Sequence, residues 1–127
     1  MSRILVVEDY PITREPLVRL LRYEGYEVDC AANGIEAMHS LGRQVPDLIL
    51  LDVVMPKMNG LALLEEIRQD SRLRHLPVIA ITGSQDSAQI ASVRSHNVRT
   101  VLDKSRFTVD QLLDEIERSL PGCGLAS

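Results

Sequence analysis

Five polar residues lie directly after short apolar runs, and their types could support metal-assisted chemistry. They are Glu8, Asp9, Asp52, Thr82 and Lys104. Carboxylates packed together repel one another, and a hard divalent cation such as Mg²⁺ relieves that repulsion. A carboxylate can also be the nucleophile of a phosphoryl transfer, in which cations and hydroxyl groups stabilise the transferred oxygens. The set therefore favours Mg²⁺-dependent transfer to Asp52, with Lys104 and Thr82 assisting.

The elements that must position these residues are visible as apolar runs that alternate with amphipathic stretches. The runs are at 3–7, 27–31, 47–51, 77–81 and 98–102. The segments ILVV, LILL and VIAI show no polar alternation, which is typical of strands buried on both faces of a parallel sheet. The segment EVDCAA alternates more and fits an edge strand.

Helical patterns occupy the intervals between the runs. The first helix follows an N-cap at Thr13, which places Pro16 in the first turn, and it stops at Gly25. The others cover 34–41, a stretch ending near 71, about 86–95 and a stretch that follows an N-cap at Thr108. The side chains expected to be buried on the last three helices are Leu61, Leu64 and Ile67, then Ile90, Ala91 and Val93, and finally Leu112, Leu113, Ile116 and Leu120.

Five strand–helix units in strict alternation predict a doubly wound α/β fold, with a parallel five-stranded sheet inside a three-layer α/β/α sandwich. We expect one domain over 1–121 and a flexible tail at 122–127. In an open parallel sheet, ligands bind beyond the carboxyl ends of the strands. The five polar residues should therefore converge on one rim of the sheet.

The composition excludes several other kinds of site. The 127 residues carry a net charge of −4 and only 3% aromatic residues, which disfavours direct binding of nucleic acid. Cys30 and Cys123 are too few and too far apart for a disulfide framework or a zinc site. With neither a signal-peptide pattern nor an apolar stretch of about 20 residues, the expected location is the cytoplasm, away from membranes.

Taken together, these residues resemble the CheY-like receiver domain of two-component response regulators. The resemblance covers about 3–120 and is carried by Glu8-Asp9, Thr82, Lys104 and the segment DVVMPKMNG at 52–60, which fits the pattern D-x-x-M-P-x-M-x-G. It implies the flavodoxin-like strand order 2-1-3-4-5. It also implies that Asp52 is phosphorylated by a sensor histidine kinase or a histidine phosphotransfer protein. Such a domain catalyses its own phosphorylation and dephosphorylation and is not a conventional turnover enzyme.

The same resemblance assigns the remaining roles. Mg²⁺ would be bound by Glu8, Asp9, Asp52 and the backbone carbonyl of Val54, and Thr82 would act in catalysis and in switching. Signals would reach a downstream protein target through the surface of the fourth helix, fifth strand and fifth helix, which could also form a weak homodimer.

Three positions depart from the family or stand out beside it. In the family, the residue that corresponds to Lys104 is usually followed by a proline, commonly with a cis bond, whereas Ser105 follows it here. A non-proline cis bond costs about 2.5–4 kcal/mol. We therefore expect a trans bond after Lys104 and slower phosphorylation. The aromatic switch residue is replaced by Val101, which is too small to move as that ring does. Gly83 either opens access to the phosphate or only allows a backbone turn.

Three alternative functions share parts of this architecture or chemistry. A flavodoxin-type cofactor binder would need a phosphate-binding loop where Glu8-Asp9 stand. A haloacid-dehalogenase-type phosphatase would need a carboxylate at Val54. A degenerate receiver that acts only as a protein-interaction module stays open, as does the choice between a stand-alone protein and a piece of a longer regulator or hybrid kinase.

Overall fold

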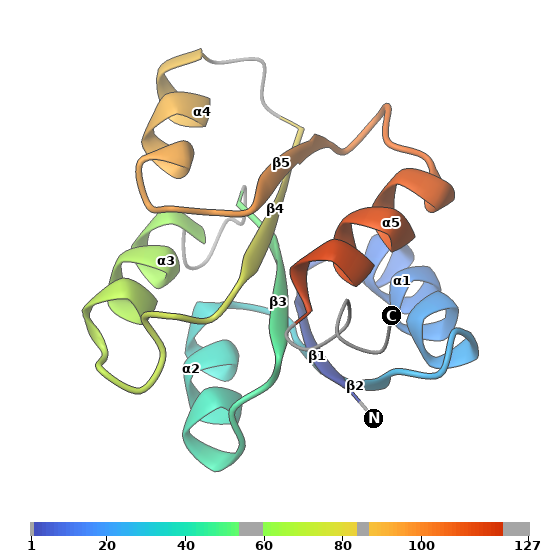
Figure 1. Ribbon diagram of the computed structural model, residues 1–127, viewed down its shortest axis with the longest axis horizontal. Coiled ribbons are helices and arrows are strands. Elements are labelled where there is room, and N and C mark those ends of the chain that lie inside the picture. Colours follow the sequence, from blue (N-terminus) through green and yellow to red (C-terminus); the bar gives the residue numbers. More distant parts are fainter. Residues whose placement is uncertain (1, 54–59, 84–86, 121–127) are drawn as a thin grey trace.

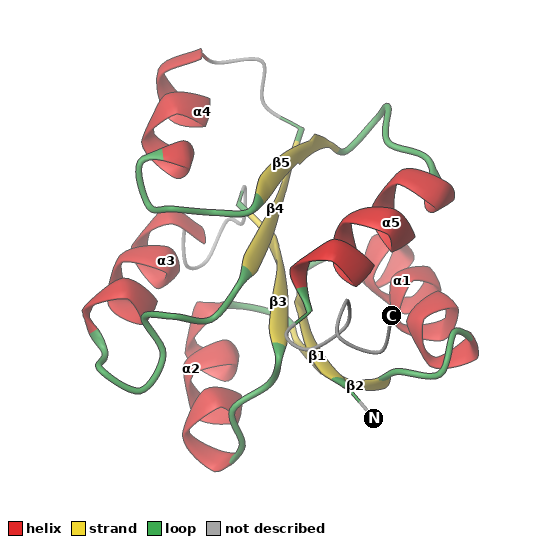
Figure 2. Cartoon of the chain, in the orientation of Figure 1, coloured by secondary structure: helices red, strands yellow, loops and turns green. Residues whose placement is uncertain are grey.

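The computed structural model describes residues 2–53, 60–83 and 87–120. Its strands are β1 (Arg3–Val7), β2 (Glu27–Ala31), β3 (Leu48–Asp52), β4 (Val78–Thr82) and β5 (Thr100–Asp103). Its helices are α1 (Pro11–Tyr23), α2 (Gly34–Arg43), α3 (Gly60–Gln69), α4 (Ser87–Arg94) and α5 (Val109–Ser119). Strands and helices alternate along the whole described chain (Figure 2), as predicted.

The strands form one parallel sheet in the order β2-β1-β3-β4-β5. The predicted α/β fold and its flavodoxin-like order are therefore confirmed. The alternating segment EVDCAA forms β2 at an edge of the sheet, while the central strands β1, β3 and β4 are buried on both faces. This arrangement follows from the apolar runs, because a central strand has helices over both faces.

The core has two layers because the helices divide between the faces of the sheet. Figure 1 shows α1 and α5 on one face and α2, α3 and α4 on the other. Alternate residues of each strand enter opposite layers: on β1, Ile4 and Val6 pack towards α1 and α5, while Leu5 and Val7 pack towards α2 and α3. The result is the predicted three-layer sandwich. No helix among the described residues is long and apolar enough to cross a membrane.

The start of α1 differs from the prediction. The helix begins at Pro11 with Tyr10 as its N-cap, not after Thr13, because proline is favoured at the first helical position, where no N–H is needed. Pro16 consequently lies inside the helix, not in its first turn, and the helix lacks one backbone donor there.

The later helices follow the prediction with local corrections. On α3, Leu63 is fully buried with Leu64 and Ile67, and Leu61 is only half-buried. On α4, Val93 is the buried residue and Ala91 is exposed, because this short helix covers little of the sheet. Thr108 caps α5 as predicted, in a capping box with Gln111. The predictions for Val54, for the turn at 55–59 and for the tail at 122–127 fall outside the described residues.

Candidate functional site

The predicted site residues lie where the central strands end. Glu8 and Asp9 follow β1, Asp52 is the last residue of β3, and Thr82 is the last residue of β4. The register aligns Asp52 with Ile81 and Thr82 with Asp103, so β3, β4 and β5 end at one level. Parallel pairing therefore brings together residues that are far apart in the sequence, as expected for the carboxyl rim of such a sheet.

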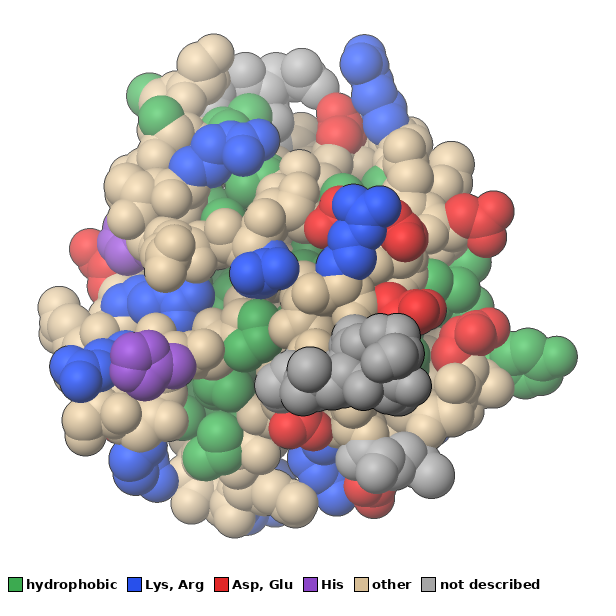
Figure 3. Space-filling view, in the orientation of Figure 1, with side chains coloured by type: hydrophobic (Ala, Val, Ile, Leu, Met, Phe, Trp, Pro, Cys, Tyr) green, Lys and Arg blue, Asp and Glu red, His purple; other side chains and the backbone are tan. Residues whose placement is uncertain are grey.

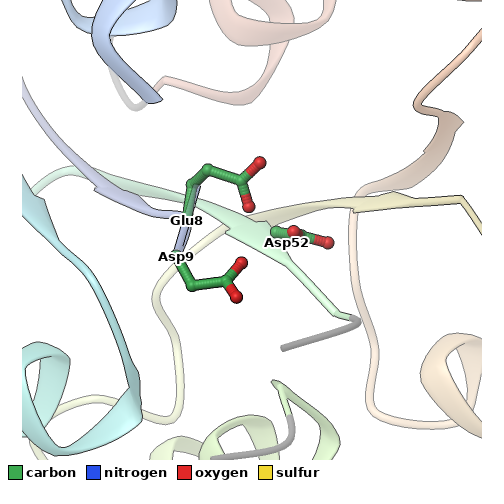
Figure 4. A group of neighbouring side chains, drawn as sticks. All are labelled: Glu8, Asp9 and Asp52. Carbon is green, nitrogen blue, oxygen red and sulfur yellow. The ribbon is translucent and has the colours of Figure 1, made fainter. Parts of the chain in front are cut away.

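The three carboxylates form a compact cluster. Glu8, Asp9 and Asp52 each place one oxygen within 4.8 Å of the others. Figure 4 shows the first two side chains leaving the end of β1 and the third leaving the end of β3, with all three carboxylates directed to the same side. Glu8 is 2% exposed and Asp52 is 3% exposed, so water screens their repulsion only weakly.

Lys104 supplies the positive charge of the cluster. Its Nζ lies 2.7 Å from Glu8 Oε1 and 3.1 Å from Asp52 Oδ2, and its backbone N–H donates to the Thr82 carbonyl at 2.9 Å. The described residues contain no cis peptide bond, so the Lys104–Ser105 bond is trans, as expected. Asp103 Oδ1 accepts hydrogen bonds from the Ser105 N–H and hydroxyl, which closes this turn without a proline.

Burial and crowding shift the ionisation of the site. Desolvation, reinforced by the neighbouring Asp52 carboxyl, raises the pKa of Glu8 from 4.5 to about 7, although Lys104 opposes the shift. Burial alone would lower the pKa of Lys104, but its hydrogen bonds to Glu8 and Asp52 outweigh burial and raise it. The lysine is therefore charged at neutral pH, while the cluster contains three carboxyl groups for its single ammonium.

The carboxylate cluster fits a divalent cation because it contains buried oxygens that lack hydrogen-bond partners among the described residues. Glu8 Oε2 and Asp9 Oδ1 are buried and have no hydrogen-bond partner among the described residues. Buried carboxylate oxygens without partners are costly, and oxygen ligands of this kind suit Mg²⁺. Glu8, Asp9 and Asp52 can therefore hold Mg²⁺. The fourth predicted ligand, the Val54 carbonyl, lies outside the described residues.

We expect the raised pKa of Glu8 to give the metal-free protein an unusual pH dependence. Because the folded protein binds this proton more tightly than the unfolded chain, Glu8 should lower stability as the pH rises from about 4.5 to about 7, by a total on the order of 3 kcal/mol. Urea unfolding in EDTA across this window measures the effect. In Glu8→Gln the decline should disappear, whereas Glu15→Gln, at an exposed position on α1, should keep it. A wild-type curve parallel to that of Glu8→Gln would contradict the assignment.

Sequence reasoning missed one residue that holds the cluster in place. Arg14, in α1, donates from Nη1 to the Glu8 carbonyl at 2.9 Å and to the Asp9 carbonyl at 3.4 Å. The guanidinium thereby fixes the backbone that presents both carboxylates. The available signal was its position in the first turns of the helix directly after the acidic pair, but that position alone does not reveal the direction of the side chain.

Two positions that stood out in the sequence are now placed. Val101 is half-buried on β5 and packs against the core layer of α2, α3 and α4, and Thr82 is buried at the end of β4. Gly83 has no positive φ, and a Cβ there would meet no described atom within 4 Å. The backbone at Gly83 therefore does not require glycine, so a backbone turn does not explain this residue. Easier access to the phosphate stays a hypothesis.

An apolar cavity reaches the cluster from the α1 and α5 side. It has a volume of about 460 Å³. Its lining includes Leu17, Leu20 and Phe107 together with Glu8, Asp52 and Lys104. Ile12, which is 89% exposed, and Val109, which is 51% exposed, also line it. The carboxylates can thus be approached across an apolar surface.

Comparison with protein families gives one match that covers most of the chain. The family model for the response regulator receiver domain matches residues 4–117. Among curated proteins, the chain is 38% identical over 117 residues to the transcriptional regulatory protein CrdR of Helicobacter pylori, covering 92% of this chain and 54% of that protein. It is 29% identical to the polar-differentiation response regulator DivK of Brucella anthropi, covering 92% of this chain and 94% of DivK.

Solved structures show the same similarity. The response regulator TrrA of Thermotoga maritima, solved in complex with Mg²⁺-BeF, is 35% identical with a TM-score of 0.82, covering 94% of this chain and all of that chain. The chemotaxis protein CheY4 of Vibrio cholerae is 28% identical with a TM-score of 0.86, covering 94% of this chain and 99% of that chain. The chain spans about half of CrdR and about a third of the Escherichia coli regulator of RpoS, 54% and 34% of their lengths.

Proposed function

The chain belongs to the response regulator receiver domain family, and from this premise we propose that it accepts a phosphoryl group on Asp52 in a Mg²⁺-dependent reaction. The observation that carries the proposal is the cluster of Glu8, Asp9 and Asp52, in which Lys104 contacts Glu8 and Asp52 and two buried carboxylate oxygens find no partner among the described residues. The phosphoryl donor would be a sensor histidine kinase or a histidine phosphotransfer protein, and the cytoplasm is the compartment in which we expect the reaction.

Each residue of the site has its own role in the proposed phosphoryl transfer. An Asp52 carboxylate oxygen forms a bond to phosphorus while the bond from phosphorus to the donor imidazole nitrogen breaks, and the imidazole leaves with that electron pair. Glu8, Asp9 and Asp52 would hold Mg²⁺, and the ion would supply positive charge to neutralise the transferred oxygens. Lys104 exchanges its contact with Asp52 for a phosphoryl oxygen, and the Thr82 hydroxyl donates a hydrogen bond to another.

The apolar cavity beside the cluster supports approach of the donor from the α1 and α5 side. Ile12 and Val109 are exposed apolar residues of the cavity lining, and Tyr10, 57% exposed, has its ring centroid 5.6 Å from Lys104 Nζ. Exposed apolar groups next to a reactive centre are typical of a protein-binding surface. A partner docked there could present its phosphohistidine to Asp52.

The output would leave through the surface of α4, β5 and α5 to a downstream protein. Thr82 can sense the phosphoryl group because it ends β4, next to Asp103 of β5. Val101 would transmit the signal less effectively than an aromatic switch residue, because its side chain is too small to move from a surface position into a buried pocket. A weak homodimer through the same surface is part of this proposal.

The test of the function is direct phosphorylation. With acetyl phosphate and Mg²⁺, we expect the intact mass to increase by one phosphoryl group, and peptide mapping should locate the modification at Asp52. In EDTA the modification should be absent. Phosphorylation that is equally efficient in EDTA, or none under either condition, would refute the proposal, and the second result would favour an interaction module that works without phosphate.

A further inference from the structure

A second pocket, which is polar, lies at the end of the sheet where the strands begin, opposite the carboxylate cluster. It has a volume of about 590 Å³ and is lined by Arg68, Arg72, Arg74, His75 and Arg99, which define it here as the arginine pocket. These residues come from α3, from the loop between α3 and β4 and from the position just before β5. In Figure 3, Lys, Arg and His side chains gather over α3 and the loop that follows it. Four of these residues lie within 68–75 of the sequence, and the fold brings Arg99 to them.

The base of the arginine pocket is rigid because Arg68 is held on several sides. Its Nε donates to the His96 carbonyl at 2.8 Å, and its Nη1 donates to the Arg74 and Leu76 carbonyls, both at 2.9 Å. Its Nη2 donates to the carbonyl of Asn97 at 3.3 Å. Each of these partners is a neutral carbonyl, and no carboxylate of the described residues forms an ion pair with Arg68. The guanidinium therefore links the loops on both sides of the pocket without a described counter-charge.

The other arginines keep donors for a ligand. Within the described part of the chain, no carboxylate forms an ion pair with Arg74 or Arg99, and the Arg99 side chain makes one hydrogen bond, a 3.5 Å contact to the Arg118 carbonyl. Arg72 pairs with Asp70 at 3.5 Å but is 58% exposed. The one carboxylate in the lining, Asp47, already accepts from the Arg3 N–H at 2.8 Å. The lining thus carries excess positive charge in a chain of net charge −4.

We propose that the arginine pocket binds a small molecule that carries two or more phosphate groups. Guanidinium forks match phosphate oxygens with paired hydrogen bonds, and the volume lies within the range of small-molecule sites, about 300–1,000 Å³. Leu76 and Val98 add apolar wall that could contact the rest of the ligand. An extended polyanion fits less well, because the acidic remainder of the chain would repel it.

Binding at this place would act on the described loop that leads into β5. Arg68 contacts the carbonyls of His96 and Asn97, and Asn97 holds a left-handed backbone with φ 62°. A ligand bridging Arg74 and Arg99 would join the start of β4 to the start of β5. The arginine pocket therefore offers a second input to the elements beside the proposed output surface, independent of Asp52.

The test is titration of the whole chain with pyrophosphate and with a nucleoside triphosphate in EDTA, followed by amide and arginine side-chain NMR. EDTA removes the cation that phosphate would need at the carboxylate cluster, so failure of the proposed phosphorylation does not affect the result. We expect saturable shifts at Arg68, Arg74 and Arg99, tighter binding of both probes than of inorganic phosphate, and weakening by added salt.

Matched variants complete the experiment. Arg74→Gln with Arg99→Gln should weaken binding about tenfold or more, whereas Arg19→Gln with Arg94→Gln, at exposed positions outside the lining, should leave it unchanged. Equal weakening by both pairs, shifts centred on Glu8 and Asp52, or no saturation at millimolar probe would overturn the proposal. Tight binding of a single-stranded oligonucleotide with no binding of either small probe would also overturn it.

Discussion

Replacing Asp52 with asparagine is expected to abolish phosphorylation by acetyl phosphate while leaving the fold intact. Asparagine keeps the shape of the side chain and one oxygen that can accept from Lys104, but its amide cannot act as the carboxylate nucleophile. Intact mass spectrometry in Mg²⁺ should show no phosphoryl adduct. A mapped adduct of undiminished yield would mean that the acceptor is another residue.

The same substitution should stabilise the metal-free protein. Glu8 and Asp52 share the single ammonium of Lys104, so removing the Asp52 carboxylate leaves the ammonium to Glu8 and relieves a repulsion that raises the pKa of Glu8. We expect a gain of about 1 kcal/mol in urea unfolding at neutral pH in EDTA, together with a lower Glu8 pKa. A loss of several kcal/mol would instead show that the pairing of Asp52 with Lys104 dominates.

Asp47 provides the control for Asp52 because it stands just before the other end of β3. Its Oδ2 accepts from the backbone of Arg3, far from the carboxyl rim of the sheet. Asp47→Asn should therefore be phosphorylated normally and should gain no stability. If only Asp52→Asn loses phosphorylation and gains stability, both effects depend on the carboxyl rim of the sheet. They would then not follow from the removal of an acidic residue in general.

Much of the fold could be predicted because strand burial leaves a direct mark on sequence. The uninterrupted apolar runs predicted β1 with its observed bounds and β3 and β4 within one residue, and the alternating run EVDCAA predicted the bounds of β2. The ends of those strands in turn predicted the meeting of Asp52 with Lys104, which are 52 positions apart. The predictions failed where two local signals competed, as when Pro11 and Thr13 both offered a start for α1.

Side-chain direction explains most of what the sequence could not reveal. Arg14 and Arg68 look like ordinary helical arginines, yet one holds the carbonyls of the acidic pair and the other holds those of two loops. Neither role depends on a local pattern, because each partner is set by how a loop returns to the helix. The gathering of Arg74 and Arg99 is non-local in the same way.

Gly60→Ala is the second substitution with a large expected effect, and it concerns the support of the site. Gly60 begins α3, and its N–H donates to the Val53 carbonyl at 3.0 Å. An added Cβ would lie 2.6 Å from Val53 Cα, 2.8 Å from the Val53 oxygen and 2.9 Å from the Asp52 oxygen. All three are backbone atoms, so α3 or the end of β3 must move. We expect a loss of about 3 kcal/mol in urea unfolding and weaker Mg²⁺ binding, measured by NMR titration.

Gly42→Ala is the matched control, because Gly42 lies inside α2 and a Cβ there meets no described atom within 4 Å. Alanine favours a helix over glycine by roughly 0.5–1 kcal/mol, so this variant should be more stable than the wild type. The two substitutions are chemically identical and both occur in helices, yet they should have opposite signs. If Gly60→Ala also stabilised the protein, the close approach of α3 to the Asp52 backbone would not be a constraint, and Asp52 would not depend on glycine at this position.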